Sequence, residues 1–157
     1  SQQKTANVPQ RLGNLAEEGN GSFRASALMT RAALAIQNGD RAAAMNDYRS
    51  VMNDDDVPQA YRDTATVRLT QLEFDSLKPE DVIARLQNLS KPDTAWYGTA
   101  GELTAMAMLK QNRRAEAGRL FAAIGGDQQV PESIRRRAQQ VAGTLGVDAT
   151  TATPAAR

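Results

Sequence analysis

Apolar residues recur along this chain at the spacing of amphipathic helices, and short polar breaks rich in glycine, proline and asparagine separate the segments. Between residues 58 and 75, Tyr61, Ala65, Leu69 and Leu72 follow one another at intervals of four or three positions, which places them on one side of a helix. The pattern predicts about eight helices, near residues 9–18, 22–38, 41–52, 58–75, 79–89, 94–110, 113–124 and 131–145. No segment has the alternation that predicts a strand.

Local signals refine three of these helices. In the first, Leu12, Leu15 and Ala16 predict one apolar face. Ser22 is expected to cap the second helix, whose apolar pattern begins at Phe23. Trp96 begins the apolar pattern of the helix that starts near residue 94. The short turns between helices predict antiparallel neighbours.

The chain also repeats itself at an offset of 73 residues, and small residues align with small, aromatic with aromatic and proline with proline. Such a fixed offset is typical of a repeat architecture. The sequence therefore predicts an all-α fold, a solenoid of about eight antiparallel helices in roughly four pairs. The aligned pairs are Ala32 and Ala105, Ile36 and Leu109, Gly39 and Asn112, Arg41 and Arg114, Ala44 and Ala117, Tyr48 and Phe121, Val51 and Ile124, Val57 and Val130, Pro58 and Pro131, Tyr61 and Ile134, Arg62 and Arg135, Ala65 and Ala138, and Leu72 and Leu145.

Composition supports close helix packing and narrows the chemistry. Aromatic residues make up only 4% of the 157 residues, so small side chains must bring the helices together. We expect one helical domain at residues 9–145, a disordered leader at 1–8 and a disordered tail at 146–157. The formal net charge of +1 indicates no general attraction to nucleic acid or anionic lipid. Cysteine and histidine are absent, which excludes disulfides, thiolate or imidazole metal sites and the catalysis that depends on them.

Two sets of residues resemble the tetratricopeptide repeat, in which two antiparallel helices meet at a tight turn. The match consists of small residues in both helices, a turn residue and an aromatic residue in the second helix. The closing proline comes later than in that family's pattern, and residues 59–90 fit it poorly, which indicates a degenerate repeat. The matching residues are Ala32, Gly39, Ala44 and Tyr48 in the first copy, and Ala105, Asn112, Ala117 and Phe121 in the second.

The order of the segments GDRAAA, VPQAYRDTA, Trp96-Tyr97 and VPESIRRRA is similar to one bacterial family, the tetratricopeptide-like domain of the ancillary subunit of the Sec translocon. The resemblance covers roughly residues 12–145. It implies a membrane helix before Ser1, a location on the periplasmic face of the inner membrane, and binding of translocon or chaperone components or of unfolded segments. No cofactor and no nucleic acid are expected, contact with the membrane is expected only through the anchor, and a homo-oligomer is possible.

Many tetratricopeptide proteins bind peptides on a concave face lined by the first helix of each pair. Transferred to this chain, the resemblance predicts a protein-binding face of methionine, aliphatic, aromatic and polar side chains. Methionine at such positions would suit varied apolar partners. The alternative is that these residues pack in the core. The predicted face consists of Met29, Ile36, Gln37, Val67, Gln71, Phe74, Glu102, Met106, Leu109 and Lys110.

Other polar clusters predict structure more than chemistry. The acidic run at residues 54–56 lacks the alternation, glycine and distal glutamate of a calcium loop, so we expect it to cap or solvate the next helix. The arginines at 135–137 spread around a helix and predict solvated or salt-bridged side chains. Ser90-Lys91 lacks the spacing of a serine–lysine catalytic pair.

The sequence thus predicts a non-enzymatic protein-binding module. Two alternatives remain open. One is a soluble cytosolic tetratricopeptide scaffold, and the other is a structural or assembly component of the cell envelope whose grooves are filled by its own chain or a second copy.

Overall fold

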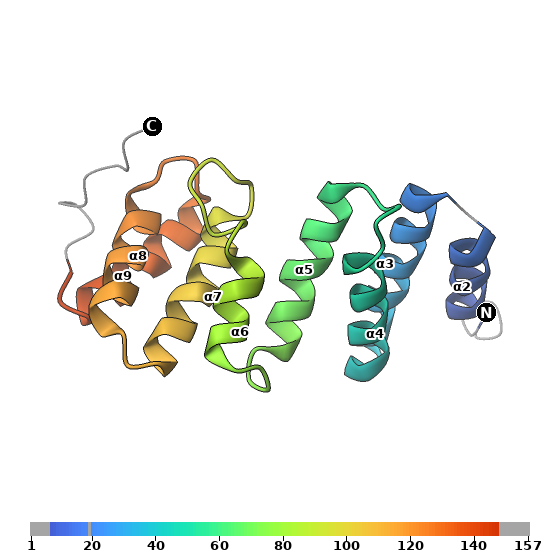
Figure 1. The fold of residues 1–157 in the computed structure, drawn as a ribbon, viewed down its shortest axis with the longest axis horizontal. Coiled ribbons are helices and arrows are strands. Elements are labelled where there is room, and N and C mark those ends of the chain that lie inside the picture. The colour runs from blue at the N-terminus through green and yellow to red at the C-terminus, as the bar shows by residue number, and fades with distance from the viewer. Residues whose placement is uncertain (1–6, 19, 148–157) are drawn as a thin grey trace. The chain divides into compact units, whose positions relative to one another are not determined.

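The computed structural model describes residues 7–18 and 20–147 and is helical in that part, without a strand (Figure 1). The prediction of an all-α fold of about eight helices is therefore confirmed. The predicted leader and tail fall largely on residues 1–6 and 148–157, which lie outside the described residues. The helices are α2 (Val8–Glu18), α3 (Gly21–Gln37), α4 (Arg41–Met52), α5 (Gln59–Glu73), α6 (Pro79–Leu86), α7 (Tyr97–Lys110), α8 (Arg114–Gly126) and α9 (Glu132–Thr144).

The chain divides into two compact units, with the boundary between Glu73 and Phe74. In the N-terminal unit, α2 packs on α3, α3 on α4, and α4 on α5. In the C-terminal unit, α6 packs on α7, α7 on α8, and α8 on α9. Consecutive helices thus form hairpins within each unit, which is the packing expected of a helical-repeat chain.

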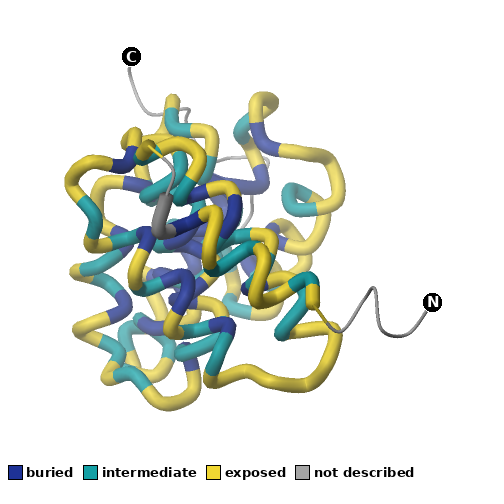
Figure 2. The backbone as a smooth tube through the Cα atoms, turned by 90° about the vertical axis from the view of Figure 1, so that its right-hand side faces the viewer, coloured by how far each residue is buried: buried dark blue, intermediate teal, exposed yellow. Residues whose placement is uncertain are grey.

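The repeat seen in the sequence is also a repeat of buried positions. Each unit has an apolar core in which small residues let the helix backbones approach and larger ones fill the space between them. Buried and exposed positions alternate along the helices at the helical period (Figure 2). The core residues that coincide at the offset of 73 are Ala32 and Ala105, Ala44 and Ala117, Tyr48 and Phe121, Val51 and Ile124, Val57 and Val130, Ala65 and Ala138, and Leu69 and Ala142.

The turns between paired helices repeat in backbone detail. Gly39 has a φ angle of 80° between α3 and α4, and Asn112 has a φ angle of 60° between α7 and α8. Both residues occupy the left-handed region, which glycine and asparagine tolerate best. The Gly39 amide donates to the Ile36 carbonyl at 3.0 Å, and the Asn112 amide donates to the Leu109 carbonyl at 2.9 Å. The prediction that asparagine replaces glycine at this turn is confirmed.

Two local predictions are wrong, one about the cap of α3 and one about the apolar faces of α2 and α3. Asn20, not Ser22, caps α3: its side chain accepts from the Phe23 amide at 3.1 Å. Phe23 itself is 61% exposed and Leu15 is 46% exposed, so neither continues the apolar face predicted for its helix.

The start of α7 differs in a similar way. Trp96 lies just before the helix and is only half-buried, whereas its neighbour Tyr97 is buried in the core of the C-terminal unit. The inward face of α7 therefore begins one residue later than predicted. Of the described helices, none combines the length and the apolar character needed to span a membrane.

Candidate functional site

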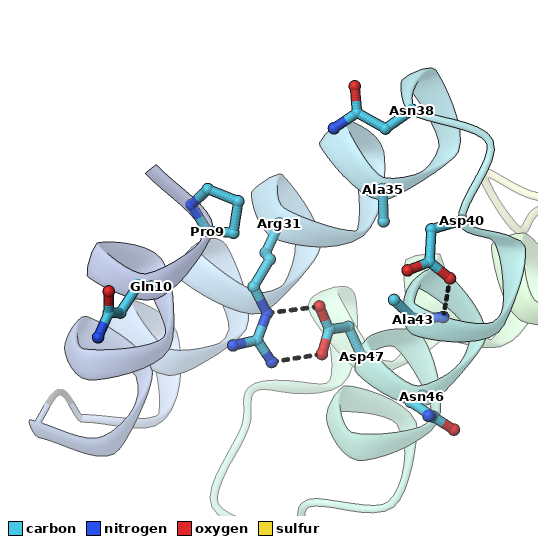
Figure 3. Close-up of a pocket in the computed structure, with 9 residues that line it drawn as sticks. All are labelled: Pro9, Gln10, Arg31, Ala35, Asn38, Asp40, Ala43, Asn46 and Asp47. Atoms are coloured by element: carbon cyan, nitrogen blue, oxygen red, sulfur yellow. Dashed lines mark hydrogen bonds and ion pairs between the residues drawn. The ribbon is translucent and has the colours of Figure 1, made fainter. Parts of the chain in front are cut away.

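A pocket of about 520 Å³ opens between α2, α3 and α4 of the N-terminal unit (Figure 3). Its volume falls within the usual range for ligand-binding pockets. Side chains from all three helices line it, together with the turn between α3 and α4. The lining residues are Pro9, Gln10, Arg31, Ala35, Asn38, Asp40, Ala43, Asn46 and Asp47.

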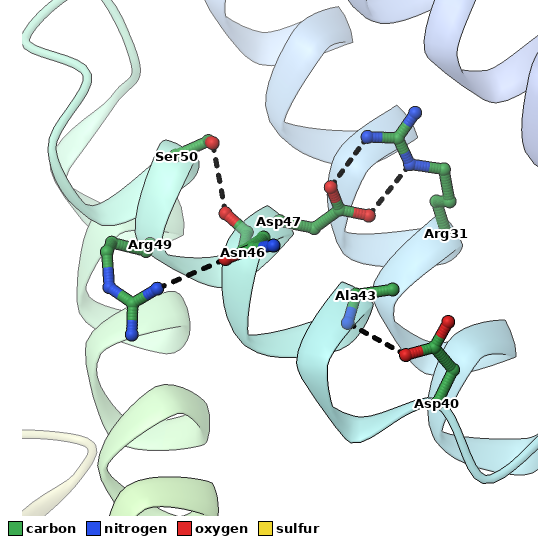
Figure 4. Close-up of polar contacts among 7 residues, drawn as sticks. All are labelled: Arg31, Asp40, Ala43, Asn46, Asp47, Arg49 and Ser50. Atoms are coloured by element: carbon green, nitrogen blue, oxygen red, sulfur yellow. Dashed lines mark hydrogen bonds and ion pairs between the residues drawn. The ribbon is translucent and has the colours of Figure 1, made fainter.

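A bidentate ion pair lies in this pocket and joins α3 to α4 (Figure 4). Arg31 donates through Nε to Asp47 Oδ2 at 2.8 Å and through Nη2 to Asp47 Oδ1 at 2.6 Å. Asp47 is only 6% exposed, so its charge requires this partner. Because both carboxylate oxygens accept hydrogen bonds from the guanidinium, Asp47 stabilises the packing of the two helices and is unsuited to act as a general base.

The other polar groups of the pocket also stabilise the helices. Asp40 caps α4 by accepting from the Ala43 amide at 3.0 Å. The Asn46 side-chain oxygen accepts from Arg49 at 3.3 Å, as Figure 4 shows. The amides of Gln10 and Asn38 line the same cavity. A pocket of amides and neutralised charge suits hydrogen bonds to a polar ligand such as a peptide backbone.

The five predicted face residues of the N-terminal unit divide by exposure. Ile36 and Gln37 are exposed at the end of α3, and Ile36 shows 41% of its surface. Gln71 on α5 is exposed as well. Met29 is half-buried and packs against the core, and Val67 is fully buried.

The five predicted face residues of the C-terminal unit divide in the same way. Met106 is 43% exposed on α7. Lys110 is also exposed, and its ammonium lies 4.2 Å from the centre of the Phe74 ring, which is itself buried. Leu109 is half-buried against the core, and Glu102 is half-buried and paired with Arg137.

Within each unit the structure therefore leaves only part of the predicted set open to solvent. The accessible members are Ile36, Gln37, Gln71, Met106 and Lys110. That these residues bind a partner stays a prediction.

The acidic run before α5 is held by arginines. Asp54 accepts from Arg24 Nε at 2.7 Å, and its second oxygen accepts from the Asp56 amide at 3.0 Å. The hydrogen bond from Arg24 holds the pKa of Asp54 below its ordinary value, and the same bond raises the pKa of Arg24. Asp55 pairs with Arg62 at 3.2 Å. In the described part of the chain, no cluster of three acidic, histidine or cysteine residues could hold a metal ion.

The arginines at 135–137 bond within the C-terminal unit. Arg135 donates to the Val130 carbonyl at 3.0 Å, Arg136 pairs with Glu132, and Arg137 forms two hydrogen bonds to Glu102, at 2.9 and 2.6 Å. These contacts agree with the salt-bridged surface that the sequence predicts.

The residues at 90 and 91 also bond to their own unit. The Ser90 hydroxyl bonds to the Leu86 carbonyl and the Thr104 hydroxyl, whereas the Lys91 ammonium bonds to Asn88. The two side chains therefore have separate structural partners.

Sequence reasoning missed the α2–α4 pocket and its ion pair. One signal was present: Asp47 lies between Ala44 and Tyr48, on the side of α4 that the apolar pattern turns inward. An acidic residue at such a position requires a cation, but the sequence does not show that Arg31, 16 residues earlier, supplies it.

Comparison of the chain with protein-family models, with curated proteins and with solved structures finds no match in any of the three.

Proposed function

We propose that this chain is a non-catalytic protein-binding module in which the first helix of each hairpin, α3 in the N-terminal unit and α7 in the C-terminal unit, contacts partner proteins. Its contacts are reversible and need no cofactor. The partners are other proteins, including unfolded or extended segments.

The supporting observation is the position of the exposed apolar side chains. Among the described residues, the large apolar side chains that stand exposed are Leu15, Phe23, Ile36 and Met106. Phe23 and Ile36 lie on α3, and Met106 lies on α7. Leu15 lies on α2, and the other three exposed side chains lie on α3 and α7, the helices to which the resemblance assigns the binding face; this agreement supports the proposal.

The resemblance to the ancillary Sec translocon subunit gives this proposal a place in the cell. In this version the domain is held at the periplasmic face of the bacterial inner membrane by an N-terminal anchor, and it binds translocon or chaperone components. The cytosolic scaffold and the envelope assembly component are the competing versions.

Charge placed on the exposed apolar positions tests the binding role. In the full-length protein, Ile36→Asp combined with Met106→Asp should abolish the recovery of specific partners by cross-linking in the cell. The matched control is Ser50→Asp with Ala123→Asp, because these exposed positions lie on α4 and α8 and correspond at the repeat offset. Circular dichroism and thermal melting must stay unchanged in both pairs. Equal recovery from both pairs, or unfolding of the first, would contradict the proposal.

Cell fractionation tests the location. We expect the full-length protein in the membrane fraction, and we expect added protease to reach the domain only after the outer envelope is opened. A soluble cytosolic product would reject the translocon version and favour the cytosolic scaffold.

A further inference from the structure

The two units differ where the first helix of the repeat, α3 or α7, meets the loop that precedes α5 or α9. In the N-terminal unit, Arg24 of α3 donates to Asp54 in this loop at 2.7 Å, and its Nη2 lies 3.9 Å from Asp56. At the repeat offset, Tyr97 takes the place of Arg24 and Asp127 takes the place of Asp54. The C-terminal unit thus keeps the carboxylate that binds a guanidinium and lacks the arginine.

The loop itself has the same geometry in both units. The Asp56 amide donates to Asp54 Oδ1 at 3.0 Å, and the Gln129 amide donates to Asp127 Oδ1 at 2.9 Å. The carbonyls of the same two aspartates accept from the amides of Val57 and Val130, each at 3.1 Å. The Asp127 carboxylate is therefore presented on the backbone turn that presents the Asp54 carboxylate to Arg24.

A pocket of about 310 Å³ lies in the C-terminal unit at this place. It is smaller than the 520 Å³ pocket of the N-terminal unit and has room for a side chain. Asp127 and Asp93 are the two acidic residues that line it, and no described residue forms an ion pair with either of them. The lining residues are Asp93, Thr94, Ala95, Tyr97, Gly98, Asp127, Gln129, Val130 and Pro131.

Tyr97 adds a hydroxyl group to the pocket. The residue is only 5% exposed and lines the pocket, yet no described residue offers a hydrogen-bond partner to its hydroxyl. The hydroxyl oxygen itself is open to solvent, since Arg62 Nε is the side-chain atom that is both buried and unpartnered in the described part of the chain, so a ligand in the pocket can reach it. Burial raises the pKa of Tyr97, and the negative charge of Asp127 adds to this effect, so the phenol stays protonated near neutral pH. A protonated hydroxyl can also accept a hydrogen bond from a cationic donor.

The surrounding basic residues point elsewhere. Arg135 donates to the Val130 carbonyl and to the Gln128 side chain, and Lys91 donates to Asn88. The carboxylates of the pocket thus remain available to an external cation.

We infer that this pocket binds a guanidinium group, that of an arginine side chain from a partner protein, through Asp127, Asp93 and the Tyr97 hydroxyl. The N-terminal unit supplies the template, because its own Arg24 fills the corresponding position. The planar fork of a guanidinium matches a carboxylate better than an ammonium does. The inference rests on the proposed function, since it assigns one side chain of the partner.

Nuclear magnetic resonance titration of the isotope-labelled chain tests the pocket directly. The probes are N-acetyl-arginine methylamide, the neutral isostere N-acetyl-citrulline methylamide, and a pentapeptide with arginine between alanines. We expect saturable shifts at the amides of Gly98, Gln128 and Gln129 with the two arginine probes and none with citrulline. Stronger binding of the pentapeptide assigns the arginine to a protein. Equal or weaker binding would overturn that assignment in favour of a small guanidinium ligand.

Variants complete the test. Asp127→Asn keeps an oxygen for the Gln129 amide and should weaken binding about tenfold or more, as expected for loss of a charged hydrogen-bond partner. Tyr97→Phe should weaken it less. Asp81→Asn is the matched control, because Asp81 is exposed on α6 of the same unit and does not line the pocket. Equal shifts with citrulline, no saturable shift, or full binding by Asp127→Asn would overturn the inference.

The outcome is separable from that of the proposed function. If no arginine binding is seen but partners are still recovered, the arginine-binding inference alone is rejected. Binding of arginine by a chain that recovers no partner would remove the protein-binding role alone.

Discussion

The N-terminal and C-terminal units pack their helices in the same order and differ in the residues at some of the contacts between helices. At three repeat-related positions the N-terminal unit has large, half-buried residues and the C-terminal unit has glycine; the pairs are Leu28 and Gly101, Met45 and Gly118, and Met52 and Gly125. A Cβ atom at Gly101, Gly118 or Gly125 would lie 2.7, 2.8 or 2.6 Å from a neighbouring side chain. The core positions that the two units share therefore define the hairpin, while these three positions are filled either by a long side chain or by the approach of a neighbour.

The contrast is reversed at the first turn of α3, where the N-terminal unit has the glycine. Gly21 begins α3 so close to the following loop that a Cβ would lie 2.0 Å from the Asp56 carbonyl oxygen. At the corresponding position the C-terminal unit has Thr94, which lines the 310 Å³ pocket. One unit closes this junction with backbone contact and an internal arginine, whereas the other leaves it open.

The largest expected effect comes from forcing the closed junction apart. Gly21→Ala should destabilise the N-terminal unit by about 3 kcal/mol, because the new methyl group meets a backbone atom that a rotamer change cannot move. Urea unfolding followed by circular dichroism measures the loss.

Gly143→Ala in α9 is the control for that change. A Cβ at Gly143 meets nothing within 4 Å, so the variant should gain up to about 1 kcal/mol from helix propensity. If Gly21→Ala is as stable as the parent chain, Gly21 and Asp56 do not make the close contact that distinguishes the two units.

The next effect concerns the ion pair that one unit has and the other lacks. The repeat equivalents of Arg31 and Asp47 are Thr104 and Leu120. Asp47→Leu alone should cost about 2 to 3 kcal/mol, because it removes the carboxylate that holds a half-buried guanidinium.

The double variant sharpens this result. Combining Arg31→Thr with Asp47→Leu reproduces the pair found in the C-terminal unit and should be more stable than the sum of the single variants predicts. A double-mutant cycle in urea measures the coupling. Strict additivity would show that the two side chains stabilise the chain independently.

The helices and the repeat could be predicted from the sequence because they depend on periodicity and on side-chain size. Gly39 and Asn112 identified their turns, and Ala44 and Ala117 identified the helix contacts, from the local pattern and its repetition at the offset of 73. The exposure of the proposed binding residues was predicted less fully: Ile36 and Met106 are exposed, while Val67 and Phe74 are buried. Helical spacing shows which residues share a side of a helix but not how deeply neighbouring elements cover that side.

The pockets could not be predicted for a related reason. The 520 Å³ pocket contains the pairing of Arg31 with Asp47, and the 310 Å³ pocket lacks the pairing that Arg24 and Asp54 form in the N-terminal unit. Charges 16 or 30 residues apart meet only after the hairpins form. Aligning Arg24 with Tyr97 at the offset of 73 would have shown the substitution, but not that a pocket accompanies it.

The pH dependence of stability gives a smaller effect. Asp54 has a pKa below its ordinary value of 3.8 because Arg24 donates a hydrogen bond to its carboxylate. A lowered pKa stabilises the folded chain above the ordinary value, and this contribution disappears as the pH falls through the folded-state pKa. Asp54→Asn should therefore lower the melting temperature at pH 7, and the difference should shrink as the pH falls below 3.8 and vanish below the folded-state pKa.

Asp127→Asn supplies the comparison for this effect. It removes the corresponding carboxylate of the C-terminal unit, which has no ion-pair partner among the described residues, so its melting temperature at neutral pH should change less than that of Asp54→Asn. Equal decreases for the two variants would mean that Arg24 does not distinguish the units energetically.

The smallest effect comes from exchanging the two turn residues. A Cβ at Gly39 meets nothing within 4 Å, so a substitution there is opposed only by the positive φ angle of 80°. Gly39→Ala should cost about 1 kcal/mol, and Gly39→Asn about half as much, because asparagine tolerates this conformation better than alanine. Asn112→Gly should relieve strain at its φ angle of 60° and change stability by less than about 0.5 kcal/mol. The two turns have equivalent backbone hydrogen bonds. A loss of stability from Gly39→Asn larger than that from Gly39→Ala would therefore show that side-chain contacts, and not backbone conformation, determine which residue each turn prefers.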